Sequence, residues 1–438
     1  MAERSEAVEE HAVRDGSATY SVEAGITTSE DVPPGYKRTE VGLIPKDWQL
    51  FALGEILTNV RNGAVYTPDR RDGLPITRIE TISNGIIDWA KVGLAKPDIH
   101  LKGYLIETGD ILYSHINSVD HIGKVAVFSG DGPLYHGMNL LLLRPEKYVY
   151  PYWLFFHLAS EPARKWARAT AKQAVSQASI NTKELRKYII ALPSQEEQRA
   201  IATALSDADA LIESLDRLIA KKRAIKQAAM QQLLSGQTRL PGFTGEWETK
   251  RLGDVAELHR RGITPGAFPD AMFQHFSLPA FDETQTPTLD LGTTIGSSKF
   301  RVPEKAVLVS KLNPRIPRIW KPESIGANAV ASTEFLLFTP REGVSRDFLY
   351  VLCCSPKFVE QMELLVTGTT GSHQRISPAN ALKIEIMLPP SSDEQTPIAT
   401  VLSNMDTEIE ALEHRRDKAH QIKQGMMQHL LTGGTRLV

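Results

Sequence analysis

The sequence predicts an α+β protein built as an internal repeat, with two β-rich mixed domains and two long helices that pair as an antiparallel coiled coil about a pseudo-two-fold axis. Two observations carry this prediction. Two long stretches of the 438-residue chain repeat each other in register. The segments that precede them contain matching runs of strand-like residues. Each half of the chain is therefore expected to be one mixed domain followed by one helix.

The repeat is clearest between residues 198–240 and 395–437. Each residue of the second stretch lies 197 positions after its partner, and about half of the paired positions are identical. Pro193 and Pro389 stand before the stretches, and Gly236 and Gly433 stand at their ends, which are helix start and stop signals. We expect two helices of roughly 38–40 residues, each about 55–60 Å long at 1.5 Å per residue.

Apolar residues recur along both stretches at steps of four and three, which is typical of a helix that packs against another helix. The expected seam, which we also expect to dock partner subunits, consists of Ile201, Leu205, Ile212, Leu215, Ile398, Leu402, Met405, Ile409 and Leu412. The alternative is two unrelated core helices. Thr396-Pro397 replaces Arg199-Ala200 in the second copy, and a proline there would fray the start of the helix if the helix began earlier.

The segments before the helices match as well, since Trp48 and Trp247 lie 199 positions apart, as do the Leu-Gly pairs that follow them. Strand-like runs are expected at 75–79, 110–114, 124–128, 140–143, 306–310 and 334–338, with short helices at 152–158 and 348–352. We expect a disordered leader at 1–34, a first mixed domain at 35–191, the first helix at 192–236, a second mixed domain at 237–390 and the second helix at 391–438.

The composition, with 42% hydrophobic and 23% charged residues, is that of an ordinary soluble globular protein. The formal net charge of −2 neither favours nor excludes nucleic acid, because a basic surface can be balanced by acidic residues elsewhere. The longest apolar run is too short to span a bilayer. The two adjacent cysteines, Cys353 and Cys354, offer no disulfide framework, which favours a cytoplasmic protein.

The sequence lacks the motifs of the common catalytic chemistries. It contains no glycine-rich nucleotide loop ending in Gly-Lys-Ser/Thr, no Asn/Asp-Pro-Pro-aromatic tetrapeptide of an amino-methyltransferase and no His/Cys cluster with metal-ligand spacing. We therefore expect no catalytic residue, no metal site and no cofactor on this chain.

With this arrangement of repeated domains and helices, the chain resembles the specificity subunit of type I restriction-modification systems. The resemblance rests on the lead-in GYKRTEVGLIPKDW, the helix starts LPSQEEQRAIA and LPPSSDEQTPIA, and the helix ends QQLLSGQTRL and QHLLTGGTRL. In the second domain, HFSLPAFD and VLVSKLNPRIPRIW look like part of a target recognition domain of this family. The resemblance covers nearly the whole chain after Pro33.

The resemblance implies that each mixed domain is a target recognition domain that reads one half of a bipartite, asymmetric DNA site. It implies that the coiled coil sets the spacer and docks methyltransferase subunits, with two copies expected. Restriction subunits that combine a motor and a nuclease would complete the assembly. Adenine-N6 methylation with S-adenosylmethionine, and DNA cleavage with ATP and Mg²⁺, would belong to those partners.

Candidate DNA contacts are polar and basic residues on loops, because such side chains read base edges. Ser114-His115-Ile116-Asn117 aligns with Ser310-Lys311-Leu312-Asn313, so both domains place an Asn just past a strand end. The candidates are Lys311, Asn313, Arg315, Arg318, His115, Asn117, Lys124, Arg61, Arg70, Arg71, Arg260, Arg261, Gln374 and Arg375. For many of them an ordinary surface role is an equal alternative.

Two other functions remain open from the sequence. The chain could be a coiled-coil scaffold whose domains bind proteins, which would show no salt-sensitive affinity for DNA. It could also be an enzyme with an unrecognised site, in which case the isolated chain would turn over a substrate. The paired loops of basic and Asn residues favour the DNA-reading hypothesis over both.

Overall fold

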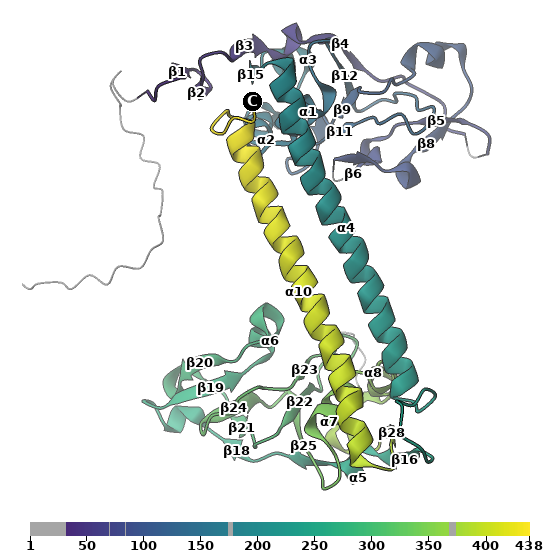
Figure 1. Cartoon of the computed structure of the whole chain (residues 1–438), viewed down its shortest axis with the longest axis vertical. Coiled ribbons are helices and arrows are strands. Elements are labelled where there is room, and N and C mark those ends of the chain that lie inside the picture. Colours follow the sequence, from purple (N-terminus) through teal and green to yellow (C-terminus); the bar gives the residue numbers. More distant parts are fainter. Residues whose placement is uncertain (1–31, 70, 84, 174–177, 368–373) are drawn as a thin grey trace, which may run out of the picture. The chain divides into compact units, whose positions relative to one another are not determined.

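The computed structural model describes residues 32–438 except 70, 84, 174–177 and 368–373. The expected leader at 1–34 therefore lies almost entirely outside the described residues. The chain forms two compact units (Figure 1). The first holds the chain up to Ser206 together with Gln424–Val438, and the second holds Asp207–Lys423. Each unit thus contains one mixed domain, the start of one long helix and the end of the other.

The two long helices are α4 (Gln195–Leu233) and α10 (Ser392–Leu430), each of 39 residues, as the repeat predicts. Each is preceded by a serine whose hydroxyl accepts a backbone N–H of the first turn. Ser194 Oγ accepts from Glu197 N at 3.2 Å, and Ser391 Oγ accepts from Asp393 N at 3.1 Å. Both helix starts are therefore capped by the serine that precedes them, through the third helical residue in α4 and the second in α10.

Pro397 lies inside α10, because the helix begins at Ser392, five residues earlier. The expectation that such an early start would fray is wrong. The residues before the proline are anchored by side chains, since Glu394 and Gln395 are both 1% exposed. Gln395 Oε1 accepts a hydrogen bond from Ser345 N at 2.8 Å, and its amide group donates to Gly343 O at 3.0 Å. These contacts offset the hydrogen bond that the proline cannot donate.

The core sheet of the first unit is antiparallel, with strand order β11-β9-β12-β4. Its strands are β4 (Leu57–Asn62), β9 (Ile111–Tyr113), β11 (Val125–Val127) and β12 (Leu141–Pro145), and the helices α1 (Pro151–Ala159), α2 (Glu161–Thr170) and α3 (Thr182–Arg186) follow. β3 (Gln49–Ala52) pairs with β15 (Ile189–Leu192), which leads directly into α4. Short strands complete the unit: β1 (Tyr36–Thr39), β2 (Gly42–Pro45), β5 (Leu74–Ile76), β6 (Ile82–Ser83), β7 (Ile86–Ile87), β8 (Gly93–Ala95), β10 (Ile116–Asn117), β13 (Lys172–Gln173) and β14 (Ala178–Ser179).

The second unit repeats this plan with the order β17-β25-β22-β23. Its strands are β17 (Ala256–His259), β22 (Val307–Ser310), β23 (Ile319–Trp320) and β25 (Phe335–Pro340), with helices α5 (Leu252–Val255), α6 (Leu278–Thr284), α7 (Arg346–Cys353), α8 (Pro356–Leu364) and α9 (Pro378–Ala381). β16 (Glu248–Arg251) pairs with β28 (Glu385–Leu388) as β3 does with β15. A five-stranded sheet is added from β18 (Gly262–Ile263), β19 (Met272–Phe276), β20 (Thr288–Leu291), β21 (Lys299–Arg301) and β24 (Ala329–Ser332), and β26 (Val366–Thr367) pairs with β27 (Arg375–Ile376).

Most of the expected short elements are confirmed, but the strand expected at 75–79 is wrong in its second half. β5 ends at Ile76, and a 3₁₀ turn begins at Ile79. The chain turns because Thr81 Oγ1 accepts a hydrogen bond from Arg78 N at 2.8 Å. This local bond competes with strand pairing.

The expected seam residues are packed inside each unit. In the first unit, Ile201 and Leu205 join the core that contains Leu430 and Leu431 at the end of α10. In the second unit, Ile398, Leu402 and Met405 pack against the end of α4. Ile212, Leu215, Leu412 and Ala419 form a small cluster of their own. Ile409 is 7% exposed.

Ion pairs also join α4 and α10 within the second unit. Lys423 Nζ lies 2.5 Å from Asp209, and Lys226 pairs with Asp406. The two pairs are related by the 197-residue repeat, and their residue numbers rise along one helix as they fall along the other. The helices are therefore antiparallel there, as predicted.

Candidate nucleic-acid interface

The candidate residues of the second unit lie at one end of its core sheet. Ser310 pairs with Phe335 in β25, and His259 pairs with Leu337 in the same strand. The loops that follow β17 and β22 therefore leave the sheet at the same end, where β25 begins. Arg260 and Arg261 stand on the first of these loops, and both are exposed.

The loop Lys311–Arg318 is held against a neighbouring strand. Asn313 N donates to Gln374 O at 2.8 Å, and Ile376 N donates to Lys311 O at 3.0 Å. Asn313 adopts a left-handed backbone with φ of +49°, which asparagine tolerates better than most residues. The structure thus brings the loop that carries Lys311, Asn313 and Arg315 next to Gln374 and Arg375, although the two segments lie far apart in the sequence.

The three arginines of this region have different surroundings. Arg315 is exposed, and its Nε donates to Asn313 Oδ1 at 3.4 Å. Arg375 donates from Nε to Glu334 Oε2 at 3.1 Å, with 41% of its side chain exposed. Arg318 has 14% of its side chain exposed, and its guanidinium donates two hydrogen bonds, of 2.6 and 2.8 Å, to the carboxylate of Asp282 in α6. Hydrogen bonding to Arg318 lowers the pKa of Asp282. Arg318 is thus committed to α6 in this structure.

The first unit places its candidates at the equivalent sheet end. Leu141 of β12 pairs with Asn62 on one side and with Tyr113 on the other. Arg61 and the Ser114-His115 turn therefore lie on either side of the start of β12. Ile180 N donates to His115 O at 2.9 Å, which repeats the bond from Ile376 to Lys311 in the second unit.

Two candidates of the first unit, His115 and Arg61, face their own domain. His115 is only 7% exposed, and burial lowers the pKa of its ring to about 4, so it is neutral at pH 7. The Arg61 guanidinium donates to Gly103 O at 2.6 Å and lies 4.8 Å from the centre of the Tyr104 ring. His115 is therefore unsuited to a base contact without rearrangement, and Arg61 is partly committed to the fold.

The remaining candidates of the first unit are more accessible. Asn117 is half-buried and donates to Ser114 Oγ at 3.1 Å. Lys124 is half-buried beside the same turn, since its carbonyl accepts from Ser114 N at 2.8 Å. Arg71 is exposed, whereas Arg70 lies outside the described residues.

The sequence argument missed a set of polar residues at the helix starts. Glu197 and Gln198 open α4, Glu394 and Gln395 open α10, and all four are at most 1% exposed. Each glutamine hydrogen-bonds the backbone just before a short helix of its unit, α1 or α7, as Gln198 Oε1 does with Tyr150 N at 2.7 Å. Their equal spacing in the two repeats was the signal that could have identified them.

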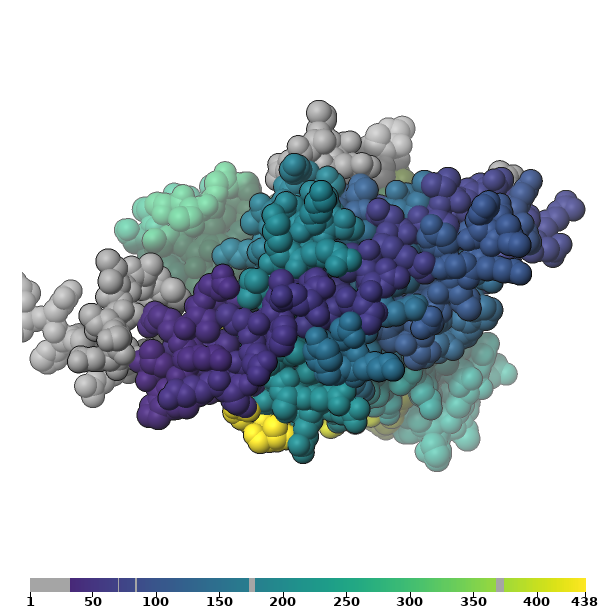
Figure 2. Space-filling view, turned by 90° about the horizontal axis from the view of Figure 1, so that it is seen from above, coloured from purple at the N-terminus to yellow at the C-terminus, as the bar shows by residue number. Residues whose placement is uncertain are grey.

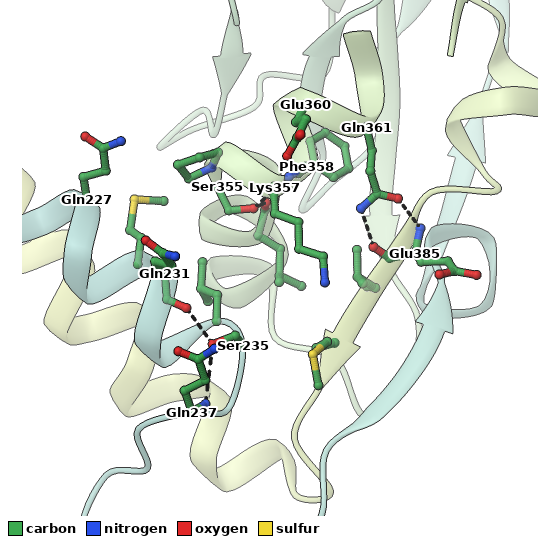
Figure 3. A pocket seen from close by; sticks show the side chains of 16 residues that line it. Gln227, Gln231, Ser235, Gln237, Ser355, Lys357, Phe358, Glu360, Gln361 and Glu385 are labelled. Carbon is green, nitrogen blue, oxygen red and sulfur yellow. Dashed lines mark hydrogen bonds between the residues drawn. The ribbon is translucent and has the colours of Figure 1, made fainter. Parts of the chain in front are cut away.

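A hollow of about 490 Å³ lies in the second unit beside the end of α4 (Figure 3). Its walls combine apolar residues such as Met230 and Phe358 with amides such as Gln231, and they also include the charged residues Lys357, Glu360 and Glu385. Gln361 bridges α8 to β28, donating to Glu385 O at 2.8 Å and accepting from Glu385 N at 3.0 Å. A lining of amides and charges of both signs distinguishes this hollow from the basic sheet end.

Within the described ranges, no group of three or more His, Cys, Asp or Glu residues is placed to hold a metal ion. Among the same residues, no helix combines the length and apolar character needed to cross a membrane. Cys353 is buried and Cys354 half-buried, and both are free thiols.

Comparison with known proteins matches two segments of the chain, residues 45–221 and 244–421, to the type I restriction modification DNA specificity domain. The chain belongs to this family. The two matches fall on the two halves of the internal repeat, so the specificity domain occurs twice.

Curated relatives agree with the family. A chain of Methanocaldococcus jannaschii assigned as the MjaX type I restriction enzyme specificity subunit is 40% identical over 234 residues, covering 50% of this chain and 55% of the relative. The EcoBI specificity subunit of Escherichia coli is 25% identical over 241 residues, covering 52% and 49%. The chain thus spans about half the length of the curated relatives it matches.

Solved structures of the family share the fold. The S subunit of a type I restriction-modification system from M. genitalium superposes with a TM-score of 0.56 at 14% identity, covering 87% of this chain and 96% of that one. A second solved chain comes from a study of complex assembly and conformational transition in the type I restriction-modification system. It superposes with a TM-score of 0.54 at 17% identity, covering 90% of this chain and 99% of that one. The two mixed domains and paired long helices are therefore a fold of this family.

Proposed function

We propose that the chain is the DNA sequence-specificity subunit of a type I restriction-modification complex, with each recognition domain reading one half of a bipartite, asymmetric site. We assign the N-terminal recognition domain to 35–191 and the C-terminal one to 237–390. The observation that carries the proposal is the occurrence of two specificity domains, each with polar and basic residues at the same end of its sheet.

The two half-sites should differ, because the matched loops carry different side chains. The second unit presents Lys311, Asn313 and Arg315, whereas the first presents Asn117 and Lys124 beside a buried His115. Arginine and lysine favour guanine, and asparagine favours adenine. The antiparallel helices would then hold the two domains at a constant separation and so set the spacer.

The proposal assigns catalysis to partner subunits in the cytoplasm. Two methyltransferase subunits would supply S-adenosylmethionine and flip the target adenine from the duplex, and restriction subunits would supply ATP-dependent, Mg²⁺-dependent cleavage. This chain would contribute the recognition surface and the docking platform.

Because the seam residues pack within the chain, we infer that docking uses another helix face. Leu211, Leu218 and Ile225 recur every seven residues along α4 and are 42%, 38% and 44% exposed. A seven-residue apolar repeat on an exposed helix face suits a partner helix. We therefore propose this stripe of α4 as part of the methyltransferase docking surface.

The function is tested by co-expressing the chain with its neighbouring methyltransferase subunit in a host that lacks DNA methylation. N6-methyladenine is then mapped across the host genome. A bipartite motif with a constant gap is the expected result. A complex that assembles but leaves the genome unmethylated would favour the scaffold hypothesis instead.

A docking variant tests the stripe separately. Leu211→Asp with Leu218→Asp should abolish co-purification of the methyltransferase subunit, because it places two charges on the proposed contact. Ala220→Asp, an exposed change on the opposite face of the same helix, serves as the control. Undiminished co-purification of the double variant would exclude this face.

A further inference from the structure

The first unit closes around a buried carboxylate at the start of α4. Glu197 is not exposed, and its oxygens accept from Arg436 Nε at 2.5 Å and Nη2 at 2.9 Å. Arg436 also donates to Asp47 at 2.8 and 3.0 Å, and Trp48 Nε1 donates to Glu197 Oε2 at 2.9 Å. Hydrogen bonds to Glu197 raise the pKa of Arg436, and its guanidinium lowers the pKa of Asp47. Arg436 is the third residue from the end of the chain described.

The contact between the two ends of the first unit extends beyond Arg436. Tyr36 Oη donates to Gly433 O at 2.9 Å. Figure 2 shows the N-terminal residues of this unit (purple) beside the C-terminal residues (yellow). A Cβ atom added at Gly433 would lie 2.4 Å from Pro45 Cδ, so the two segments are too closely packed to admit a side chain at this position.

The second unit closes in the same way around Glu394 at the start of α10. Arg239 donates from Nε and Nη2 to the two oxygens of Glu394, each at 2.6 Å. The same guanidinium donates to the backbone oxygens of Thr244, at 3.1 Å, and of Gly245. Arg239 and Glu197 each lie 197 positions before their counterparts, Arg436 and Glu394. Arg239 ends the first repeat, yet it serves the second unit.

We propose that Arg436 and Arg239 are positioning residues, each of which fixes one recognition domain on the start of the long helix that follows that domain. Arg436 would hold the N-terminal recognition domain on its helix start, and Arg239 would hold the C-terminal one. This inference rests on the proposed function for its consequence in DNA reading, whereas the contacts themselves are independent of it.

The physical reason is the burial of the carboxylates. A buried charge whose partner is removed is strongly destabilising, so the loss of either arginine forces Glu197 or Glu394 toward solvent or protonation. The neighbouring glutamine would move with it. Gln198 holds Tyr148 and Tyr150 ahead of α1, and Gln395 holds Gly343 and Ser345 ahead of α7. The recognition domain should therefore loosen where it joins the helix.

Hydrogen exchange on the full-length chain in complex with its methyltransferase subunits tests the contacts. Arg436→Gln should speed exchange by about tenfold or more in peptides covering 49–52 and 189–205, and leave 248–251 and 385–402 unchanged. Arg239→Gln should give the reverse pattern. Arg436→Lys, which keeps the charge but loses the planar fork, should give a smaller change in the same peptides. Arg415→Gln, an exposed change on α10, is the control.

Mapping N6-methyladenine with the same variants tests the consequence. Arg436→Gln should relax base preference about tenfold in the half-site of the N-terminal domain alone, and Arg239→Gln in the other half-site. Faster exchange in the wrong unit, or equally in both, would overturn the positioning proposal even if the wild type shows a bipartite motif. The expected exchange pattern in a complex that methylates nothing would retain the positioning contacts and reject the proposed function.

Discussion

Arg315 and Arg318 stand three residues apart on one loop, and their surroundings assign them different roles. Arg315 is exposed beside Asn313, whereas Arg318 is gripped by Asp282. Replacing Arg315 with Ala should cost about 1–3 kcal/mol of discrimination and relax one position of the second half-site, if its fork binds a guanine. The methylation motif and the DNA affinity of the complex are the measurements. An unchanged motif and affinity would remove Arg315 from the recognition surface, and Arg318→Ala, which should affect α6 instead, provides the comparison.

Three histidines of the first unit predict its response to acid. Burial lowers the pKa of His115, His136 and His157 to about 4, from an ordinary value of about 6.5. Between these values the unfolded chain binds protons that the folded unit does not. The stability of the first unit should therefore be complete above about pH 6.5 and fall as the pH drops toward 4, by roughly several kcal/mol in all. Hydrogen exchange of 111–127 and 134–143 at pH 7.5 and 5 measures this. Replacing His115, His136 and His157 with Gln should flatten the dependence, and a pH response that the triple variant retains in full would contradict this origin.

At the same scale, the sequence could place candidate residues on loops but not orient them. The alignment of His115 with Lys311 correctly matched two turns after equivalent strands, as the bonds from Ile180 and Ile376 show. It could not show that one side chain is buried and the other half-buried, because exposure depends on neighbours distant in sequence. The ion pair of Arg318 with Asp282 could not be predicted from the sequence for the same reason.

Among the elements, α10 contains a proline that the equivalent helix lacks. Pro397→Ala restores a helix N–H, so it should stabilise the second unit by up to about 3 kcal/mol. For a unit of roughly 200 residues, each kcal/mol raises the Tm by about 2–4 °C. The matched reverse change, Ala200→Pro in α4, should destabilise the first unit instead. Thermal unfolding of both variants decides the matter, and a Pro397→Ala chain that melts at a lower temperature would show that the proline fits this site better than the helix geometry indicates.

The seam between α4 and α10 is the second element-scale test. Leu402 is fully buried and Ile409 nearly so. Leu402→Asp with Ile409→Asp buries two unpaired charges and should separate the helices, with loss of the methyltransferase complex on size-exclusion chromatography. Thr407→Asp, on an exposed position of the same helix, should have little effect. Assembly that survives the double change would mean that the paired helices are not the docking platform.

Elements were more predictable than residues because their signals are periodic. Seven-residue spacing and capping signals predicted both long helices closely, and alternating apolar runs predicted the core strands. The failure at 77–79 came from one side-chain hydrogen bond, that of Thr81, which no periodicity reports. The continuity of α10 through Pro397 likewise depends on Gln395 and Glu394, whose partners lie far along the chain or in its other repeat.

At the scale of the whole molecule, each compact unit combines parts of both long helices, which lie far apart in the chain. The first unit is completed by Gln424–Val438, and the second by the end of α4. A linear reading assigns each helix to the domain before it, and only tertiary contacts show that each unit takes one end from each helix. The repeat itself, with its constant spacing, was fully visible in the sequence and correctly indicated that the chain contains two units of the same plan.

The central claim is that the two domains read two half-sites independently. The most direct measurement exchanges residues 237–390 for the equivalent segment of another family member and maps N6-methyladenine in the genome of a methylation-free host. The account predicts that one half of the bipartite motif changes, while the other half and the gap stay as they were. A motif that changes in both halves, or in neither, would contradict it.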